Sequence, residues 1–185
     1  MTNLYVQAQD FPEIPEAERL QRIIPPADGK VRMVLDTDTY NEIDDQFALV
    51  YTLLSGDRLD LEAVYAAPFL NNRSESAKDG MEKSYEEILR VFEKMDVSAE
   101  GFAFRGSENF LQSVNQPEES EAVDDMIRRA MQSSPNDPLY VVAVGAITNV
   151  ASAILKQPEI IKNMVVIWLG GDAPMWSNRP EFNLQ

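Results

Sequence analysis

The chain contains no cysteine and no histidine among its 185 residues. The lack of cysteine excludes disulfides, iron–sulfur clusters and a cysteine nucleophile, and the lack of both residue types excludes the usual zinc sites. A Ser-His-Asp triad is excluded too, because it needs an imidazole as general base. Any chemistry must therefore use carboxylates, amides and hydroxyls, with or without a hard cation.

Basic residues are also scarce, with 16 Lys and Arg against 31 Asp and Glu and a net charge of −15. Nucleic acids and anionic membranes are bound mainly through Lys and Arg, so we expect neither as a partner. The first ten residues lack the pattern of a signal peptide, and no run of 18 apolar residues predicts a membrane helix. We therefore expect a cytoplasmic protein that binds a small molecule or a cation.

The chain length fits a single domain. Residues 1–30 are rich in proline and charge, which predicts an N-terminal surface arm with one helical turn around Pro15–Ile23. Residues 31–185 alternate short apolar runs with segments of helical periodicity. Strands are expected at Val31–Leu35, Leu61–Phe69, Gly101–Arg105, Leu139–Val144 and Met164–Leu169, the last of them buried.

Helices are expected between these strands. The first begins near Asp44, and the spacing of Phe47, Val50, Tyr51 and Leu54 predicts its buried face. Three further helices have apolar faces built around Tyr85–Phe92 (with Met81 in the core), Val123–Met131 and Ile147–Leu155. Apolar strands alternating with helices predict an α/β fold, a mostly parallel Rossmann-like sheet with helices on both faces.

An acidic cluster directly follows the first strand and contains Asp36, Asp38, Glu42, Asp44 and Asp45. Like charges this close repel one another unless a cation or protonation relieves them. A solvated acidic loop is the plain alternative, and capping of the helix accounts for one of Asp44 and Asp45. However, ligands of parallel sheets bind beyond the carboxyl ends of the strands, which favours a functional site.

The spacing of these carboxylates can be compared with the motifs of several protein families. An EF-hand fails on spacing, since Asn41 stands where glycine is needed and Phe47 where the bidentate glutamate belongs. A phosphatase of the haloacid dehalogenase type, with Asp36 as nucleophile, is the runner-up, because Tyr40 departs from its motif and no Ser or Thr closes the second strand. A non-catalytic module that binds ribose or Ca²⁺ is a further alternative.

Three segments in register resemble the inosine-uridine-preferring nucleoside hydrolases. They are Val34-Leu35-Asp36-Thr37-Asp38 with Asp44-Asp45, then Val144-Gly145-Ala146-Ile147-Thr148-Asn149-Val150-Ala151, then Gly170-Gly171 with Glu181-Phe182-Asn183. The linker between Asp38 and Asp44 is longer than in the family pattern. The resemblance covers nearly all of residues 31–185 and implies hydrolysis of the N-glycosidic bond of nucleosides.

The resemblance also implies roles for individual residues. Asp38, Asp45 and the backbone carbonyl of Val144 would bind Ca²⁺, and Asp38 would be the general base toward a calcium-bound water. Asp44, Asn71, Glu181 and Asn183 would hold the ribose of the nucleoside substrate, although Asn71 also suits a simple turn. Asp36 would orient the loop, and no role is assigned to Trp176 or Asn178.

Family members are longer, and beyond the Glu-Phe-Asn segment they supply more strands, another calcium-binding aspartate and often a histidine near the leaving base. We therefore interpret residues 31–185 as a nucleoside hydrolase-like domain that lacks the family's C-terminal part. From these residues alone we expect little activity, weak calcium affinity and an exposed apolar face. Base specificity and homo-oligomerisation stay open.

Overall fold

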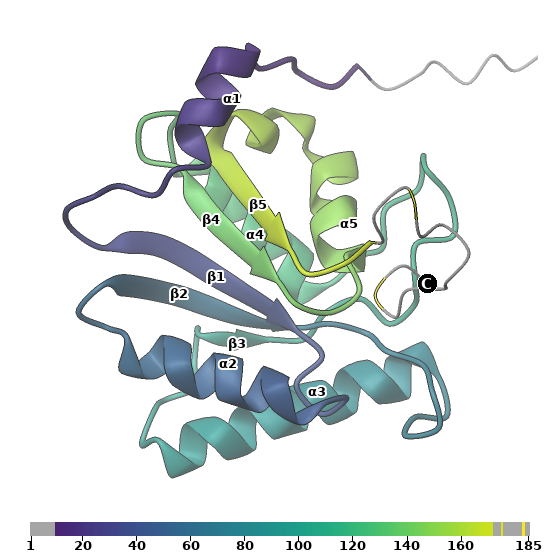
Figure 1. Ribbon diagram of the computed structural model, residues 1–185. Helices are drawn as coiled ribbons and strands as arrows, with labels where there is room; N and C mark the ends of the chain where they lie inside the picture. The colour runs from purple at the N-terminus through teal and green to yellow at the C-terminus, as the bar shows by residue number, and fades with distance from the viewer. Residues whose placement is uncertain (1–9, 172–174, 176–182, 184–185) are drawn as a thin grey trace, which may run out of the picture.

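The computed structural model describes residues 10–171, 175 and 183 of the chain (Figure 1). In chain order its elements are α1 (Glu16–Arg22), β1 (Val31–Thr37), α2 (Ile43–Leu54), β2 (Leu59–Ala66), α3 (Ala77–Lys94), β3 (Ala103–Phe104), α4 (Glu121–Met131), β4 (Leu139–Ala143), α5 (Thr148–Lys156), the 3-10 helix η1 (Pro158–Asn163) and β5 (Met164–Trp168). Within this described part, no helix is long and apolar enough to cross a membrane.

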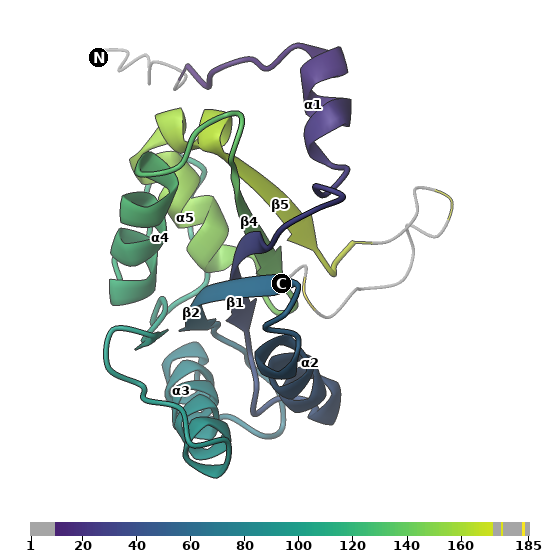
Figure 2. The same ribbon diagram turned by 90° about the vertical axis from the view of Figure 1, so that its left-hand side faces the viewer.

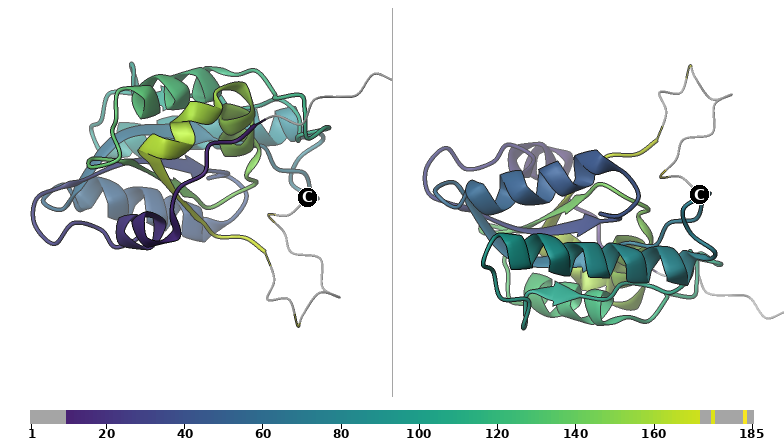
Figure 3. Two further views of the ribbon diagram at one scale, coloured as in Figure 1. Left: turned by 90° about the horizontal axis from the view of Figure 1, so that it is seen from above. Right: turned by 90° about the horizontal axis from the view of Figure 1, so that it is seen from below.

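The five strands form one sheet in the order β3-β2-β1-β4-β5, and every neighbouring pair is parallel. Helices α2 and α3 cover one face of the sheet, and α4 and α5 cover the other (Figures 2 and 3). The chain winds from β1 toward β3 in its first half and from β4 toward β5 in its second half. The sheet therefore switches direction between β1 and β4, whose carboxyl ends form the crevice where such folds bind ligands.

The core lies on both faces of the sheet, which confirms the predicted α/β class. Val34 of β1 and Met126 of α4 are fully buried on the side of α4 and α5, and Leu35, Leu49 and Phe92 are at most 1% exposed on the side of α2 and α3. Strands buried on both faces need apolar side chains at nearly every position, hence the continuous apolar runs. Met81 is buried, as predicted for the core.

Each predicted strand is observed, but with different ends, and two differences bear on the site and the core. The second strand ends at Ala66, so Ala67, Pro68 and Phe69 lie in the loop beyond it. The prediction that the fifth strand is buried throughout was wrong, because Val166 and Ile167 are 40% and 50% exposed. In the described sheet β5 pairs only with β4, and an edge strand packs against neighbours on one side only.

The predicted buried face of α2 was wrong at three of its four residues, since of these only Val50 packs against the core. Asp45, Leu49 and Thr52 are the buried residues of this helix, whereas Phe47, Tyr51 and Leu54 are each at least 68% exposed. The helix is apolar on two opposite sides, and the periodicity singled out the side that faces away from the sheet.

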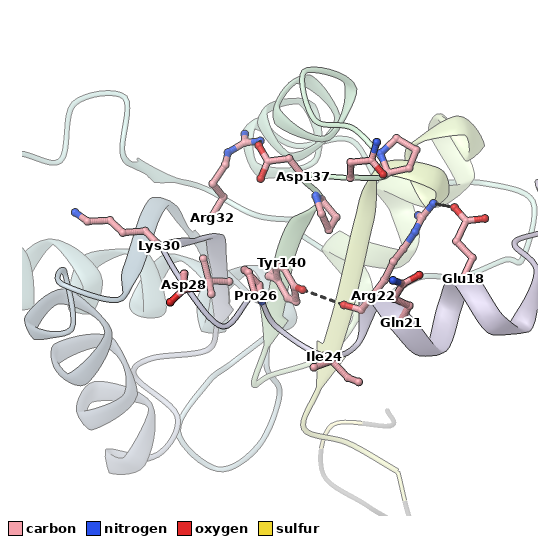
Figure 4. A pocket seen from close by; sticks show the side chains of 14 residues that line it. Glu18, Gln21, Arg22, Ile24, Pro26, Asp28, Lys30, Arg32, Asp137 and Tyr140 are labelled. Carbon is pink, nitrogen blue, oxygen red and sulfur yellow. Dashed lines mark hydrogen bonds and ion pairs between the residues drawn. The ribbon is translucent and has the colours of Figure 1, made fainter.

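Residues 10–30 hold the short helix α1, which buries none of its side chains. The hydroxyl of Tyr140 donates a hydrogen bond of 2.9 Å to the carbonyl of Arg22, which ties α1 to β4. Between this segment and the amino-terminal ends of β1 and β4 lies a cavity of about 440 Å³ (Figure 4). Its charged side chains include Arg22, Lys30 and Asp137. It lies at the opposite end of the strands from the acidic cluster.

Candidate active site

The acidic cluster lies at the carboxyl end of β1, held between the two neighbouring strands. The amide of Val144 donates to the carbonyl of Asp36, and the amide of Ala67 donates to the carbonyl of Thr37, both at 2.9 Å. These bonds continue the sheet beyond β2 and β4 and fix the start of the loop. Asp36, Asp38 and Asp45 are buried, whereas Asp44 is exposed.

Asp38 is held in the loop by Asn41. The side-chain amide of Asn41 donates to Oδ2 of Asp38 at 2.9 Å, and the backbone amide of Asn41 donates to the carbonyl of Asp38 at 2.6 Å. Oδ1 of Asn41 in turn accepts a bond of 2.6 Å from the side chain of Asn71. Burial raises the pKa of Asp38 to about 6, although the bond from Asn41 opposes this rise. Asn71 therefore reaches the cluster through Asn41.

Asp45 stands in the first turn of α2 and faces back toward the end of β1. Its Oδ1 accepts a bond of 2.9 Å from the hydroxyl of Thr37, and the hydroxyls of Thr37 and Thr39 lie 3.0 Å apart. Burial raises the pKa of Asp45 to about 7, and the negative charge of Asp38 contributes to the rise. Asp38 and Asp45 are thus close enough for their charges to interact.

The start of the loop after β4 lies against Asp38. A Cβ added to Gly145 would stand 2.7 Å from Oδ1 of Asp38, a distance that real Cβ atoms do not show, so only glycine fits there without a shift. The side-chain amide of Asn183 donates to the carbonyl of Val144 at 3.2 Å and to that of Leu169 at 2.7 Å. The structure thus brings Asp38, Val144 and Asn183 to one place.

Asp36 has different surroundings, since it is fully buried beneath the loop. Its Oδ1 accepts a bond of 2.8 Å from the side-chain amide of Asn149, while its Oδ2 is buried without a hydrogen-bond partner. Burial raises the pKa of Asp36 to about 7, opposed by the bond from Asn149. A phosphoryl-accepting nucleophile must be reachable by its substrate, so this burial weighs against the phosphatase alternative.

The side chains at the cluster offer oxygen atoms only, the donor type that Ca²⁺ prefers. Asp38 and Asp45 are two buried carboxylates close to each other, and the described residues near them provide no Lys or Arg ion pair. The cluster fits a hard cation in donor type and charge. The number of ligands is lower than Ca²⁺ needs. No three acidic side chains among the described residues converge on one point, whereas Ca²⁺ takes six to eight oxygen ligands.

Most of the predicted site residues that the structure describes come together. Asp38, Asp45, Val144 and Asn183 lie at the loop, Asn71 reaches it through Asn41, and Asp44 is at the same helix end. Glu181, Trp176 and Asn178 lie outside the described residues. Five further residues of the site were not predicted from the sequence: Thr37, Thr39, Asn41, Gly145 and Asn149. Thr37, Gly145 and Asn149 stood within quoted motifs, whereas the roles of Thr39 and Asn41 depend on contacts that no spacing indicates.

Solved structures with the same fold include three nucleoside hydrolases. An inosine-guanosine nucleoside hydrolase superposes with a TM-score of 0.62 at 18% identity, over 84% of this chain and 53% of its own. A plant nucleoside hydrolase gives 0.54 at 19% identity, over 78% and 49%. A purine-preferring ribonucleoside hydrolase from Gardnerella vaginalis gives 0.52 at 18% identity, over 76% and 49%. The chain spans about half the length of these structures.

Among curated proteins, no significant match is found. The family model described as inosine-uridine preferring nucleoside hydrolase matches residues 33–185, which include the acidic cluster, the loop after β4 and Asn183. The chain therefore belongs to the inosine-uridine preferring nucleoside hydrolase family.

Proposed function

We propose that this chain carries part of the active site of an N-ribosyl hydrolase. Such an enzyme hydrolyses the N-glycosidic bond of ribonucleosides and releases ribose and the free base. One observation carries the proposal. In a member of this family, two buried and interacting carboxylates, Asp38 and Asp45, lie at the switch point of the sheet, and Asp38 lies against Gly145.

Asp38 is proposed as the general base. Asn41 holds one of its oxygens, Oδ2, while Oδ1 lies toward Gly145. A pKa of about 6 suits a carboxylate that must accept a proton near neutral pH and release it again. As a water molecule attacks the anomeric carbon, Asp38 takes one of its protons and the hydroxyl stays on the sugar. The bond from that carbon to the base breaks through an oxocarbenium-like transition state, and its electron pair leaves on the base, which takes up a proton to give the free base.

Ca²⁺ is proposed to be held by the carboxylates of Asp38 and Asp45 and the carbonyl of Val144, and it would polarise the attacking water. The second lone pair of the Val144 carbonyl is available beside its bond from Asn183. Thr37 orients Asp45 through the bond of 2.9 Å between its hydroxyl and Oδ1. These residues supply three ligands, so further ligands come from water, substrate or other protein groups.

Asp44, Asn71, Glu181 and Asn183 are proposed to hold the ribose. Asp44 is exposed in the first turn of α2, where its carboxylate can accept bonds from sugar hydroxyls. Asn71 and Asn183 approach the loop from the segments that follow β2 and β5. Bonds to hydroxyls that strengthen as the sugar flattens stabilise the transition state more than bound substrate.

Release of ribose tests this function. The chain, and a longer form where one exists, is incubated with inosine, uridine and nicotinamide riboside, with Ca²⁺ or with a chelator. Calcium-dependent release that Asp38→Asn abolishes and Asp137→Asn leaves intact supports the proposal, because Asp137 is exposed at the far end of the strands. A non-catalytic module instead predicts a calcium-dependent rise in melting temperature with no release from any form.

A further inference from the structure

Three successive backbone carbonyls at the end of β4 and in the loop beyond it, those of residues 143–145, accept hydrogen bonds from the side of β5. The first accepts a bond of 2.9 Å from the amide of Leu169, and the second accepts a bond of 3.2 Å from the side chain of Asn183. The third, that of Gly145, accepts a bond of 3.0 Å from the indole N–H of Trp168. The backbone that faces the acidic cluster is therefore positioned from β5 as well as from β1.

The side chain of Trp168 reaches Gly145 from the neighbouring strand, since β5 runs beside β4 (Figure 1). Trp168 is the last residue of β5 and pairs with Ala143, so its side chain reaches two residues further along the neighbouring segment. The indole is partly buried and packs, like Ile147, against the core under α4 and α5. A tryptophan side chain has one N–H, so its whole donor capacity is used at Gly145.

The glycine pair after β5 makes room for this ring. A Cβ added to Gly170 would stand 2.3 Å from Cε2 and 2.4 Å from Cζ2 of Trp168, closer than real Cβ atoms approach another atom. The ring therefore lies directly against the backbone of Gly170, an approach that only glycine allows without a shift. The first glycine of the Gly170-Gly171 motif thus lets the indole turn toward Gly145.

We propose that Trp168 is a positioning residue of the candidate active site, whose indole N–H holds the backbone of Gly145 against Asp38. Gly145 is where the loop after β4 meets the acidic cluster, since a Cβ on it would lie only 2.7 Å from Oδ1 of Asp38. The preceding carbonyl, that of Val144, is the proposed backbone ligand for Ca²⁺. This inference rests on the proposed function, since it concerns the geometry of that metal site.

The indole bond restrains the proposed ligand because of the way peptide planes are joined. The carbonyls of Val144 and Gly145 belong to adjacent peptide planes that share the Cα atom of Gly145. Glycine gives these planes wide rotational freedom, and a donor fixed on β5 removes it. Groups that hold metal ligands in place typically change metal affinity by about 10–100-fold when they are removed. Loss of the indole N–H should therefore weaken calcium binding although Trp168 itself is no ligand.

Calcium titration of two altered chains tests the role of the N–H. Trp168→Phe keeps an aromatic ring without the donor, and 3-benzothienylalanine at position 168 keeps the shape of indole with sulfur in place of the N–H. Both should bind calcium at least about 10-fold more weakly than the wild-type chain in titration calorimetry. Phe104→Leu is the matched control and leaves the affinity unchanged, because Phe104 packs partly buried against the same core from β3, at the other edge of the sheet.

Hydrogen exchange gives a readout that needs neither metal nor activity. The amide of Val144 donates to the carbonyl of Asp36, so its exchange rate reports how often the start of the loop opens. In the metal-free chain, loss of the indole N–H should speed exchange at Val144 about 5-fold relative to Val141 in the middle of β4. Phe104→Leu should leave the ratio of the two rates unchanged.

An exchange ratio that stays at its wild-type value without the N–H overturns the proposal. Faster exchange with an unchanged calcium affinity overturns it too, because the bond would then not set the metal site, and so does a Phe104→Leu chain with the same effects. Failure of the proposed function is distinct from these results. A wild-type chain that binds no calcium, with a longer form that releases no ribose, refutes that function, and exchange at Val144 alone then decides whether Trp168 holds the loop.

Discussion

The side-chain amide of Asn149 donates a hydrogen bond of 2.8 Å to the carboxylate of Asp36, across 113 positions of sequence. The same side chain donates to the carbonyl of Ala66 at 3.2 Å and accepts bonds of 2.8 Å from the amide and the hydroxyl of Ser107. One buried amide thus joins β1, β2, the segment after β3 and α5. The floor of the candidate site depends on it.

Asn149→Ala is therefore expected to destabilise the fold. The substitution leaves buried groups of Asp36, Ala66 and Ser107 without a partner, which costs about 2–4 kcal/mol of the free energy of unfolding. Urea unfolding followed by circular dichroism measures the loss. Asn136→Ala, at an exposed position, should change it by less than about 0.5 kcal/mol. Equal effects of the two substitutions would contradict the role of Asn149.

Gly145→Ala should disturb Asp38 more than the fold. The new methyl group meets Oδ1 of Asp38 at 2.7 Å, and the end of a side chain can move aside more easily than backbone. We expect a modest loss of stability, about 1–2 kcal/mol, together with a calcium affinity at least about 10-fold weaker. Titration calorimetry and urea unfolding separate the two effects. An unchanged affinity would show that Gly145 does not set the position of Asp38.

The stability of the metal-free chain should fall as pH rises from about 4 to about 7. Burial raises the pKa of Asp36 and Asp45 to about 7 and that of Asp38 to about 6, from 3.8. Within this range the folded chain holds more protons than the unfolded chain, so deprotonation favours unfolding. The chain has no histidine that would titrate in the same range. Urea unfolding in chelator at pH 5 and pH 7 measures the fall.

Asp38→Asn with Asp45→Asn should flatten this pH dependence, whereas Asp137→Asn, at an exposed carboxylate, should preserve it. Calcium should raise the melting temperature more at pH 7.5 than at pH 5, because protons compete for the same carboxylates. A metal-free chain that gains stability with pH over this range would refute the assignment of the raised pKa values to the folded state.

The apolar runs of the sequence predicted the sheet well, because a strand that is buried on both faces needs apolar side chains at nearly every position. The run Val31–Leu35 marks β1, and the aspartates after it indicated where a ligand would bind. The buried side of α2 was misread, since Phe47 and Leu49 differ in surroundings that periodicity does not report. The loss of burial along β5 follows from its place at the edge of the sheet, which only the strand order reveals.

Within the site, the sequence indicated the carboxylates and not the residues that hold them. Asn41 contacts Asp38 within the same loop, but its bond to Asn71 joins two loops 30 positions apart. Gly145 matters because its backbone approaches Asp38, a relation that becomes visible only when β1 and β4 are neighbours. Such contacts follow from the topology of the sheet rather than from local sequence.

The measurement that tests the central claim most directly is ribose release from inosine and uridine by the wild-type protein and the Asp38→Asn variant, in calcium and in chelator. The proposal predicts release that requires calcium, is weak from these residues alone, and falls at least about 100-fold in Asp38→Asn. Release that persists in Asp38→Asn, or a longer folded form that releases no ribose from any nucleoside, would contradict it.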